Sequence, residues 1–204
     1  MSLCTLAQVH ALLGIGVADT EHDALLATLI SSVSSRLALL AGRSIDAVAA
    51  FESAAQVEYF SPALGTQVLY LTARPVSVVT EIKEATYGAF DEATALTVNE
   101  DYQIHQPTGK LMRIGHWQPG MMAVRVTYTG GYVAAGGTPG DGETAMPADI
   151  TDAAARQVAF SFRRRGQLGV RSAGGGGASY QTYAADDLLP EVREVALSYA
   201  RMIG

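Results

Sequence analysis

Apolar residues recur at helical spacing in two stretches near the start of the chain. The two stripes consist of Leu6, Val9 and Leu13, and of Leu26, Ile30, Val33, Leu37 and Leu40. Thr5 lies three residues before Gln8, which is the spacing of a capping box, and Gly14 suits a left-handed C-cap. Thr20 is the expected start of the second helix and Gly42 its expected end. The pattern therefore predicts two N-terminal helices, the second of about four to five turns.

From about residue 56 the pattern changes from helical to alternating, and β-branched and aromatic residues dominate. The expected strands lie around Val57 and Tyr59, over residues 68–71 and 76–82, around Tyr102 and Ile104, and over residues 111–114 and 123–129. Pro107-Thr-Gly-Lys110 has the composition of a hairpin turn. Because the strands follow one another without helices between them, we predict a small, mostly antiparallel sheet rather than βαβ units.

The final third of the chain combines a loop with two further helices. Residues 130–148 contain six glycines and two prolines, a composition that predicts a long, mobile surface loop without helix or strand. Asp149 is the expected cap of a helix that runs to Arg165. The last helix is expected to begin near Asp187, to place Pro190 in its first turn, and to reach the C-terminus.

These patterns predict a chain of the α+β class. It consists of N-terminal helices (1–48), a β insertion (49–132), a Gly/Pro-rich loop (133–148) and C-terminal helices (149–204) that contain a glycine hinge at 172–180, centred on Gly174, Gly175, Gly176 and Gly177. Since the helices are apolar along one side, we expect the two helical parts to pack as one domain. The N-terminal helical hairpin and the C-terminal helices would then frame the small antiparallel sheet.

Composition excludes several classes of protein. The 204 residues are 49% apolar, enough for a core, and the net charge of -6 argues against a protein held to nucleic acid by bulk electrostatics. Cys4 is the single cysteine, so no internal disulfide can form, and its simplest role is that of a small buried residue. We find no signal peptide and expect no run long enough to cross a bilayer, so no membrane partner is predicted.

Candidate catalytic residues are lacking. The four histidines lie in four different segments without HxxxH or CxxC spacing, and no Gly-x-Ser-x-Gly turn is present. The glycine run 174–177 leads into Ala178-Ser179-Tyr180 without the lysine of a phosphate-binding loop. We therefore predict no catalytic, cofactor-binding or metal-binding residue, and no enzyme.

One basic cluster is a candidate for function. Arg163, Arg164, Arg165 and Arg171 bracket the loop between the two C-terminal helices. Cations at the end of a helix complement its dipole, so a structural role already explains part of the cluster. A solvated helix end, a site for a partner's carboxylates and a contact with nucleic acid all remain open.

Taken together, the order and spacing of these elements resemble those of the head-tail connector proteins of tailed phages and prophages. These are also called adaptor or head-completion proteins, and the likeness is to the longer members with a β insertion. The segments that carry it are the helices 6–13 and 25–43, Arg74-Pro75-Val76, Tyr128-Thr-Gly-Gly-Tyr132, Pro147-Ala-Asp-Ile150, Phe162-Arg163-Arg164-Arg165-Gly166 and the closing helix 189–199.

The resemblance implies a structural protein of the virion neck, assembled in the cytoplasm of the bacterial host. It implies a homo-oligomeric ring, a dodecamer, that docks on the portal protein and joins a stopper or tail protein. Double-stranded DNA would pass through the ring without sequence specificity. By the same likeness, Tyr199, Arg201, Met202 and Ile203 are assigned to portal docking, and the glycine hinge to ordering on binding.

Three alternatives remain. Another neck protein, a stopper or tail terminator, also forms rings but is usually dominated by β-structure. An uncharacterised enzyme or ligand-binding domain would show a cluster of titratable residues in one cleft. A sequence-specific DNA binder would form a tight, salt-sensitive complex with free duplex.

Overall fold

The computed structural model describes residues 2–16, 18–42, 44–45, 48–49, 51–167 and 188–200. The chain forms two compact units. The helical unit comprises Met1–Ala49, Ala134–Gly136 and Met146–Gly204, and the β unit comprises Ala50–Val133 and Gly137–Ala145. The class is α+β, as predicted, and each unit has a core of its own.

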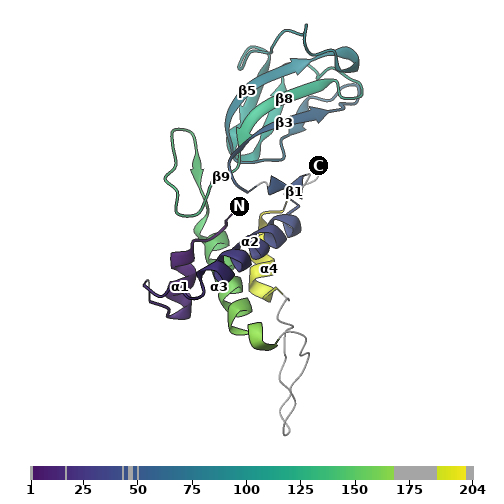
Figure 1. The fold of residues 1–204 in the computed structure, drawn as a ribbon. Helices are drawn as coiled ribbons and strands as arrows, with labels where there is room; N and C mark the ends of the chain where they lie inside the picture. Colours follow the sequence, from purple (N-terminus) through teal and green to yellow (C-terminus); the bar gives the residue numbers. More distant parts are fainter. Residues whose placement is uncertain are drawn as a thin grey trace. The chain divides into compact units, whose positions relative to one another are not determined.

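The helical unit is built around one central helix. This is α3 (Ala148–Arg163), which packs against α1 (Leu6–Leu13), α2 (Asp23–Leu40) and α4 (Pro190–Ser198), as Figure 1 shows. A short hairpin of β1 (Ser44–Ile45) and β2 (Val48–Ala49) follows α2. The core residues that the helices share include Val9, Leu26, Ile30, Val33, Leu37, Ile150, Ala154, Val158, Phe162, Val192 and Ala196.

The predicted signals at the ends of the first helix are confirmed. The Thr5 hydroxyl accepts a hydrogen bond from the Gln8 N–H, and the Gln8 side chain accepts one from the Thr5 N–H. Gly14 adopts the left-handed conformation, with φ of 71°. These are local devices, so the sequence alone is enough to place them.

The boundaries of the other helices differ from the prediction. α2 begins at Asp23, because Thr20 forms a turn in which its carbonyl accepts the Asp23 N–H, and it ends at Leu40. Asp149 does not cap α3; the helix starts at Ala148 after Pro147, which places Asp149 inside the first turn.

The far ends of α3 and α4 also differ. α3 ends at Arg163, and Arg165 belongs to a short 3-10 helix, η3 (Arg165–Gln167). α4 begins at Pro190, whereas Asp187 lies outside the described residues. α4 stops at Ser198 rather than continuing, since Tyr199 and Ala200 bond to carbonyls three residues back in a tightened last turn.

By length and composition, α2 could also cross a membrane, contrary to our expectation. It has 18 residues and a mean hydropathy of 1.4. Core helices of globular proteins satisfy the same criterion of length and hydropathy, and α2 contacts α1, α3 and α4. Its buried residues are Leu26, Ile30, Val33, Ser34, Leu37 and Ala38.

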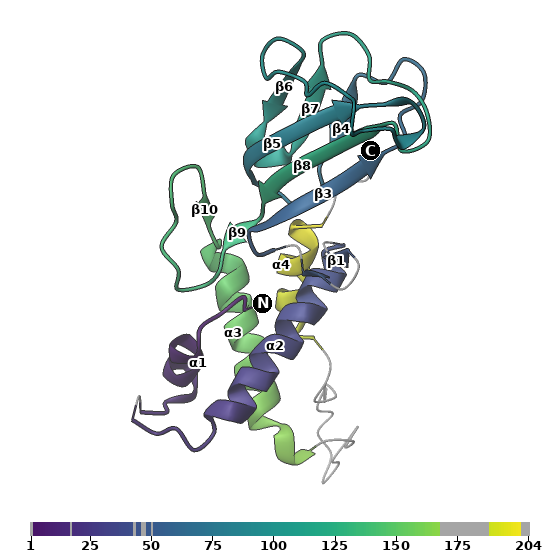
Figure 2. The same cartoon turned by 45° about the horizontal axis from the view of Figure 1, so that its top comes forward.

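The β unit is a sandwich of two antiparallel three-stranded sheets. One has the order β3 (Ala54–Phe60), β8 (Val124–Gly130), β5 (Val76–Glu84), and the other β4 (Val68–Tyr70), β7 (Lys110–Arg113), β6 (Tyr102–His105). Figure 2 shows these strands of the β unit. The core cluster consists of Leu69, Leu71, Ala73, Val76, Ile82, Tyr102, Leu111, Trp117, Val124, Val126 and Tyr128.

Two short helices and a second pair of strands complete the description. The 3-10 turns are η1 (Thr86–Gly88) and η2 (Gln106–Thr108), and η2 forms the predicted hairpin turn between β6 and β7. The prediction that residues 130–148 hold no strand is wrong. β9 (Tyr132–Val133) pairs in parallel with β10 (Thr144–Ala145), because the Gly/Pro-rich connection between them carries the chain round so that both strands run in the same direction.

Candidate functional site

The end of α3 holds the part of the arginine cluster that the structure describes. Arg163 donates to the Leu12 carbonyl of α1 at 2.9 Å. The guanidinium of Arg164 lies 5.0 Å from the centre of the Phe160 ring. The structure therefore places these two arginines against their own helical unit as well as at its surface.

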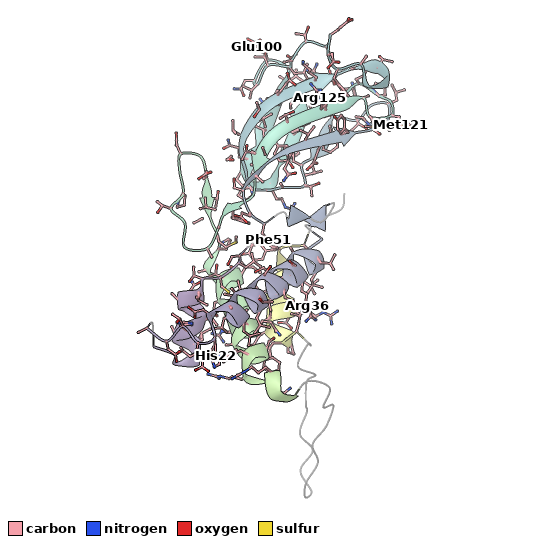
Figure 3. The ribbon with its side chains drawn as sticks, viewed as in Figure 1. His22, Arg36, Phe51, Glu100, Met121 and Arg125 are labelled. Carbon is pink, nitrogen blue, oxygen red and sulfur yellow. The ribbon has the colours of Figure 1, made fainter. Side chains whose placement is uncertain are left out.

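Arg165 turns back onto the helix that precedes it. Its guanidinium stacks 3.9 Å from the centre of the Phe162 ring and donates to the Phe162 carbonyl at 2.9 Å. The same ring meets His22 edge-on, with ring centres 5.2 Å apart, and Figure 3 labels His22 in this part of the helical unit. Arg171 and the four hinge glycines lie outside the described residues.

Tyr199 is the one residue of the predicted docking set that the structure describes. It is half-buried, and its hydroxyl donates to the Asp149 carboxylate at 2.6 Å. The bond ties the end of α4 to the first turn of α3. Arg201, Met202 and Ile203 lie outside the described residues.

The ionisable groups of the β unit with shifted pKa values have structural partners. Hydrogen bonds from Lys83 and then Arg125 lower the pKa of Glu81. The Thr97 N–H is the main group that lowers the pKa of Asp101, helped by Arg113. Such ion pairs hold strands and loops together rather than creating an acid and base pair.

Buried groups show the opposite shift. Burial raises the pKa of the Cys4 thiol to about 11 and also raises the pKa values of Tyr102 and Tyr128. Cys4 is fully buried, as predicted for a small core residue. Within the described residues, no group of three or more His, Cys, Asp or Glu side chains could hold a metal ion.

The β unit carries an exposed apolar surface that our sequence reasoning missed. Val57 and Tyr59 on β3 and Val78 on β5 are 52%, 48% and 51% exposed. The alternation of β3 did signal one solvent-facing side, but the number of apolar residues on that side became visible only once the strand was placed at a sheet edge.

Comparison with known proteins decides the family. A family model described as "Head completion protein" matches residues 2–202. The chain belongs to the head completion protein family. The predicted likeness to head-tail connector (head-completion) proteins is thereby confirmed, and the role is that of a structural protein of head completion.

Two of the solved structures with a similar fold are of gene transfer agent (GTA) particles. One chain, in a structure described as "Neck of empty GTA particle computed with C6 symmetry", is 16% identical, with 97% of this chain and 90% of that chain covered and a TM-score of 0.57. A second, from "Virion of native gene transfer agent (GTA) particle", is 18% identical over the same shares, with a TM-score of 0.54. No curated protein matches the sequence. At these identities the likeness shows that the head completion protein shares their fold.

Proposed function

We propose that this head completion protein forms a closed ring that docks on the portal vertex and joins the tail or a stopper protein. The observation that carries the proposal is the family match across residues 2–202. A protein of the same fold is described as part of a neck computed with C6 symmetry, which a ring of twelve copies would satisfy. We propose a dodecamer, assembled in the bacterial cytoplasm.

The docking segment is assigned to the end of the chain. Tyr199 supports this assignment because its hydrogen bond to Asp149 anchors the chain on α3 just before residues 201–204. Arg201, Met202 and Ile203 would then leave the helical unit from a fixed point and reach the portal. The glycine hinge would allow neighbouring segments to order when they bind.

The arginines at the end of α3 are proposed to face a partner. Arg163 and Arg165 are exposed, and the bond from Arg163 to Leu12 uses one of the five N–H donors of its guanidinium. A partner's carboxylate or a phosphate of the passing DNA could accept hydrogen bonds from the remaining N–H groups. With a net charge of -6, the chain would let duplex DNA slide through the ring without holding it.

We also propose that the protein catalyses no reaction. The groups whose pKa values are shifted support this view, because Glu81 and Asp101 form ion pairs while Cys4 and Tyr128 are buried. An enzyme site would instead bring such groups together in one cleft. Turnover of any substrate by the isolated protein would contradict the proposal.

The experiment is a mass measurement on the full chain, alone and with a purified portal vertex. We expect a species of about twelve times the 21.4 kDa subunit mass, either free or bound to the portal. Deleting residues 201–204 should abolish portal binding while the helical unit stays folded, because Tyr199 and its bond to Asp149 remain. A monomer under both conditions would refute the ring, and normal portal binding by the truncated chain would refute the docking segment.

A further inference from the structure

The two sides of the β sandwich differ in how their strand edges are covered. Beside β5 and β6, the connection between these strands bonds to both: Leu96 donates to the Ile82 carbonyl at 2.8 Å, and Asn99 donates to the Tyr102 carbonyl at 2.7 Å. On the opposite side, β3 is the outer strand of its sheet, and β8 is its one strand partner among the described residues. Among the described residues of the β unit, no strand covers this side of the sandwich.

The free edge of β3 is suited to pairing. The strand has seven residues, and its register with β8 has no bulge, whereas the register of β5 with β8 is interrupted twice. Glu58 is the single charged residue of β3, and its carboxylate is turned to the Thr72 N–H and the Tyr128 hydroxyl. An exposed, regular edge whose outward-facing side chains carry no charge is a template for another chain unless an assembly covers it.

The outer face of the same sheet extends this surface. Three rows of side chains cross it: Tyr59, Arg125 and Lys83; Val57, Thr127 and Glu81; Ala55, Thr129 and Val78. The three residues that β3 contributes to these rows, Ala55, Val57 and Tyr59, are therefore uncharged. Beyond Tyr59, a groove of about 440 Å³ lies between Phe90, Met121 and Met122, and Met121 is 78% exposed. Figure 3 labels Met121 and Arg125 on the β unit.

The charges of this face and of the groove beside it balance in number, because Glu81 on the face and Asp91 in the groove are matched by Arg125 and Lys83. Glu81 contacts Arg125 at 2.9 Å and Lys83 at 3.2 Å, and the Arg125 guanidinium also lies 5.1 Å from the centre of the Phe90 ring. DNA would require cations that are not already paired with a carboxylate. A second copy, which also carries a net charge of -6, is repelled least where the local charge is balanced.

We propose that the open edge of β3 and the outer face of its sheet form a contact with a second copy of this chain. The inference rests on the proposed ring and identifies one of its subunit contacts. A ring needs two different, complementary surfaces on each subunit, so the β3 side of one copy meets another surface of the next.

The size of the face indicates how much of the contact it supplies. Seven residues at about 3.3 Å each and three strands about 4.8 Å apart give roughly 330 Å². An ordinary stable interface buries about 800 Å² per partner. The β3 surface therefore supplies roughly two-fifths of such a contact, and other surfaces of the same two copies supply the rest.

A photo-crosslinking residue at position 57 tests the occupant. The full chain carrying p-benzoylphenylalanine in place of Val57 is assembled alone and on the portal vertex, irradiated and separated under denaturing conditions. We expect a product of about twice the 21.4 kDa subunit mass in which both linked peptides belong to this chain. A crosslink to another protein or to DNA, or none in assembled material, would overturn the proposal.

A charge at the same position tests the contribution to assembly. Val57→Lys should leave the unfolding midpoint unchanged, because the side chain is half-exposed, but should reduce the assembled fraction at least about tenfold by burying an unpaired charge. Gln103→Lys, an exposed strand position in the other sheet, is the matched control and should assemble normally. Normal assembly of Val57→Lys would overturn this contact alone. Failure of the unmodified chain to assemble, alone and with portal, would overturn the ring and this contact together.

Discussion

Replacing Arg163, Arg164 and Arg165 together with alanine should destabilise the helical unit. The triple variant loses the hydrogen bond from Arg163 to Leu12 and that from Arg165 to Phe162, each worth about 1 kcal/mol. It also loses two cation–π contacts, each worth about 0.5–1 kcal/mol. The charge of Arg163 at the end of α3 adds roughly 0.3–1 kcal/mol through the helix dipole. We expect the free energy of unfolding to fall by about 3–5 kcal/mol if these contributions add.

Two optical signals separate the units in this experiment. The single tryptophan, Trp117, is buried in the β unit, so its fluorescence follows that unit, whereas far-ultraviolet circular dichroism is dominated by the helices. Urea unfolding of the alanine variant should shift the helical signal more than the fluorescence. The triple lysine variant keeps the charges but loses the planar guanidinium groups, and should show about half the effect. A helical transition within about 0.5 kcal/mol of the unmodified protein would refute the assigned contacts.

Two further predictions concern buried groups. Tyr128→Phe should lower the free energy of unfolding by about 2–4 kcal/mol, because the Tyr128 hydroxyl donates to Glu58 and accepts the buried Ala73 N–H at 2.9 Å. Urea unfolding followed by tryptophan fluorescence measures this loss. An effect no larger than that of Tyr102→Phe would contradict the prediction. The folded pKa of Cys4 is raised from 9.0 to about 11, so the unfolded chain releases this proton first. Ionisation of Cys4 should leave the free energy of unfolding unchanged below about pH 9 and should lower it as the pH rises towards 11. The Cys4→Ala variant should lose less stability over that range. Parallel profiles of stability against pH for the variant and the unmodified protein would disprove the assignment.

Local signals were the ones that sequence reasoning could place. The capping box of Thr5 and Gln8 and the position of Pro190 in the first turn of α4 depend on residues within one helical turn. Asp149 shows the limit of this reasoning. Its type and position suit a cap, but α3 already begins at Ala148. The Asp149 carboxylate accepts the N–H of the next residue, Ile150, and the hydroxyl of Tyr199, 50 positions along the chain.

The candidate surfaces divide in the same way. Clustering of arginines before a glycine run was visible in the sequence, whereas their contacts with Leu12, Phe160 and Phe162 depend on how α1 and α3 pack. The exposed face of β3 left only a partial signal, the alternation of its apolar residues. Whether such a strand lies at the centre or the edge of a sheet depends on pairings between distant segments.

The amino-acid order by itself determined the class of the fold, the order of the longer helices and strands, and the likeness to the family, because periodicity and turn residues act over a few neighbouring positions. Tertiary structure decided the rest: the two sheets and their order, the open edge at β3, the bond between Tyr199 and Asp149, and the parallel pairing of β9 with β10. These features join segments far apart in the chain. They form only where the free energy gained by burying apolar surface exceeds the entropic cost of closing the long loops between them. No local sequence pattern encodes that balance.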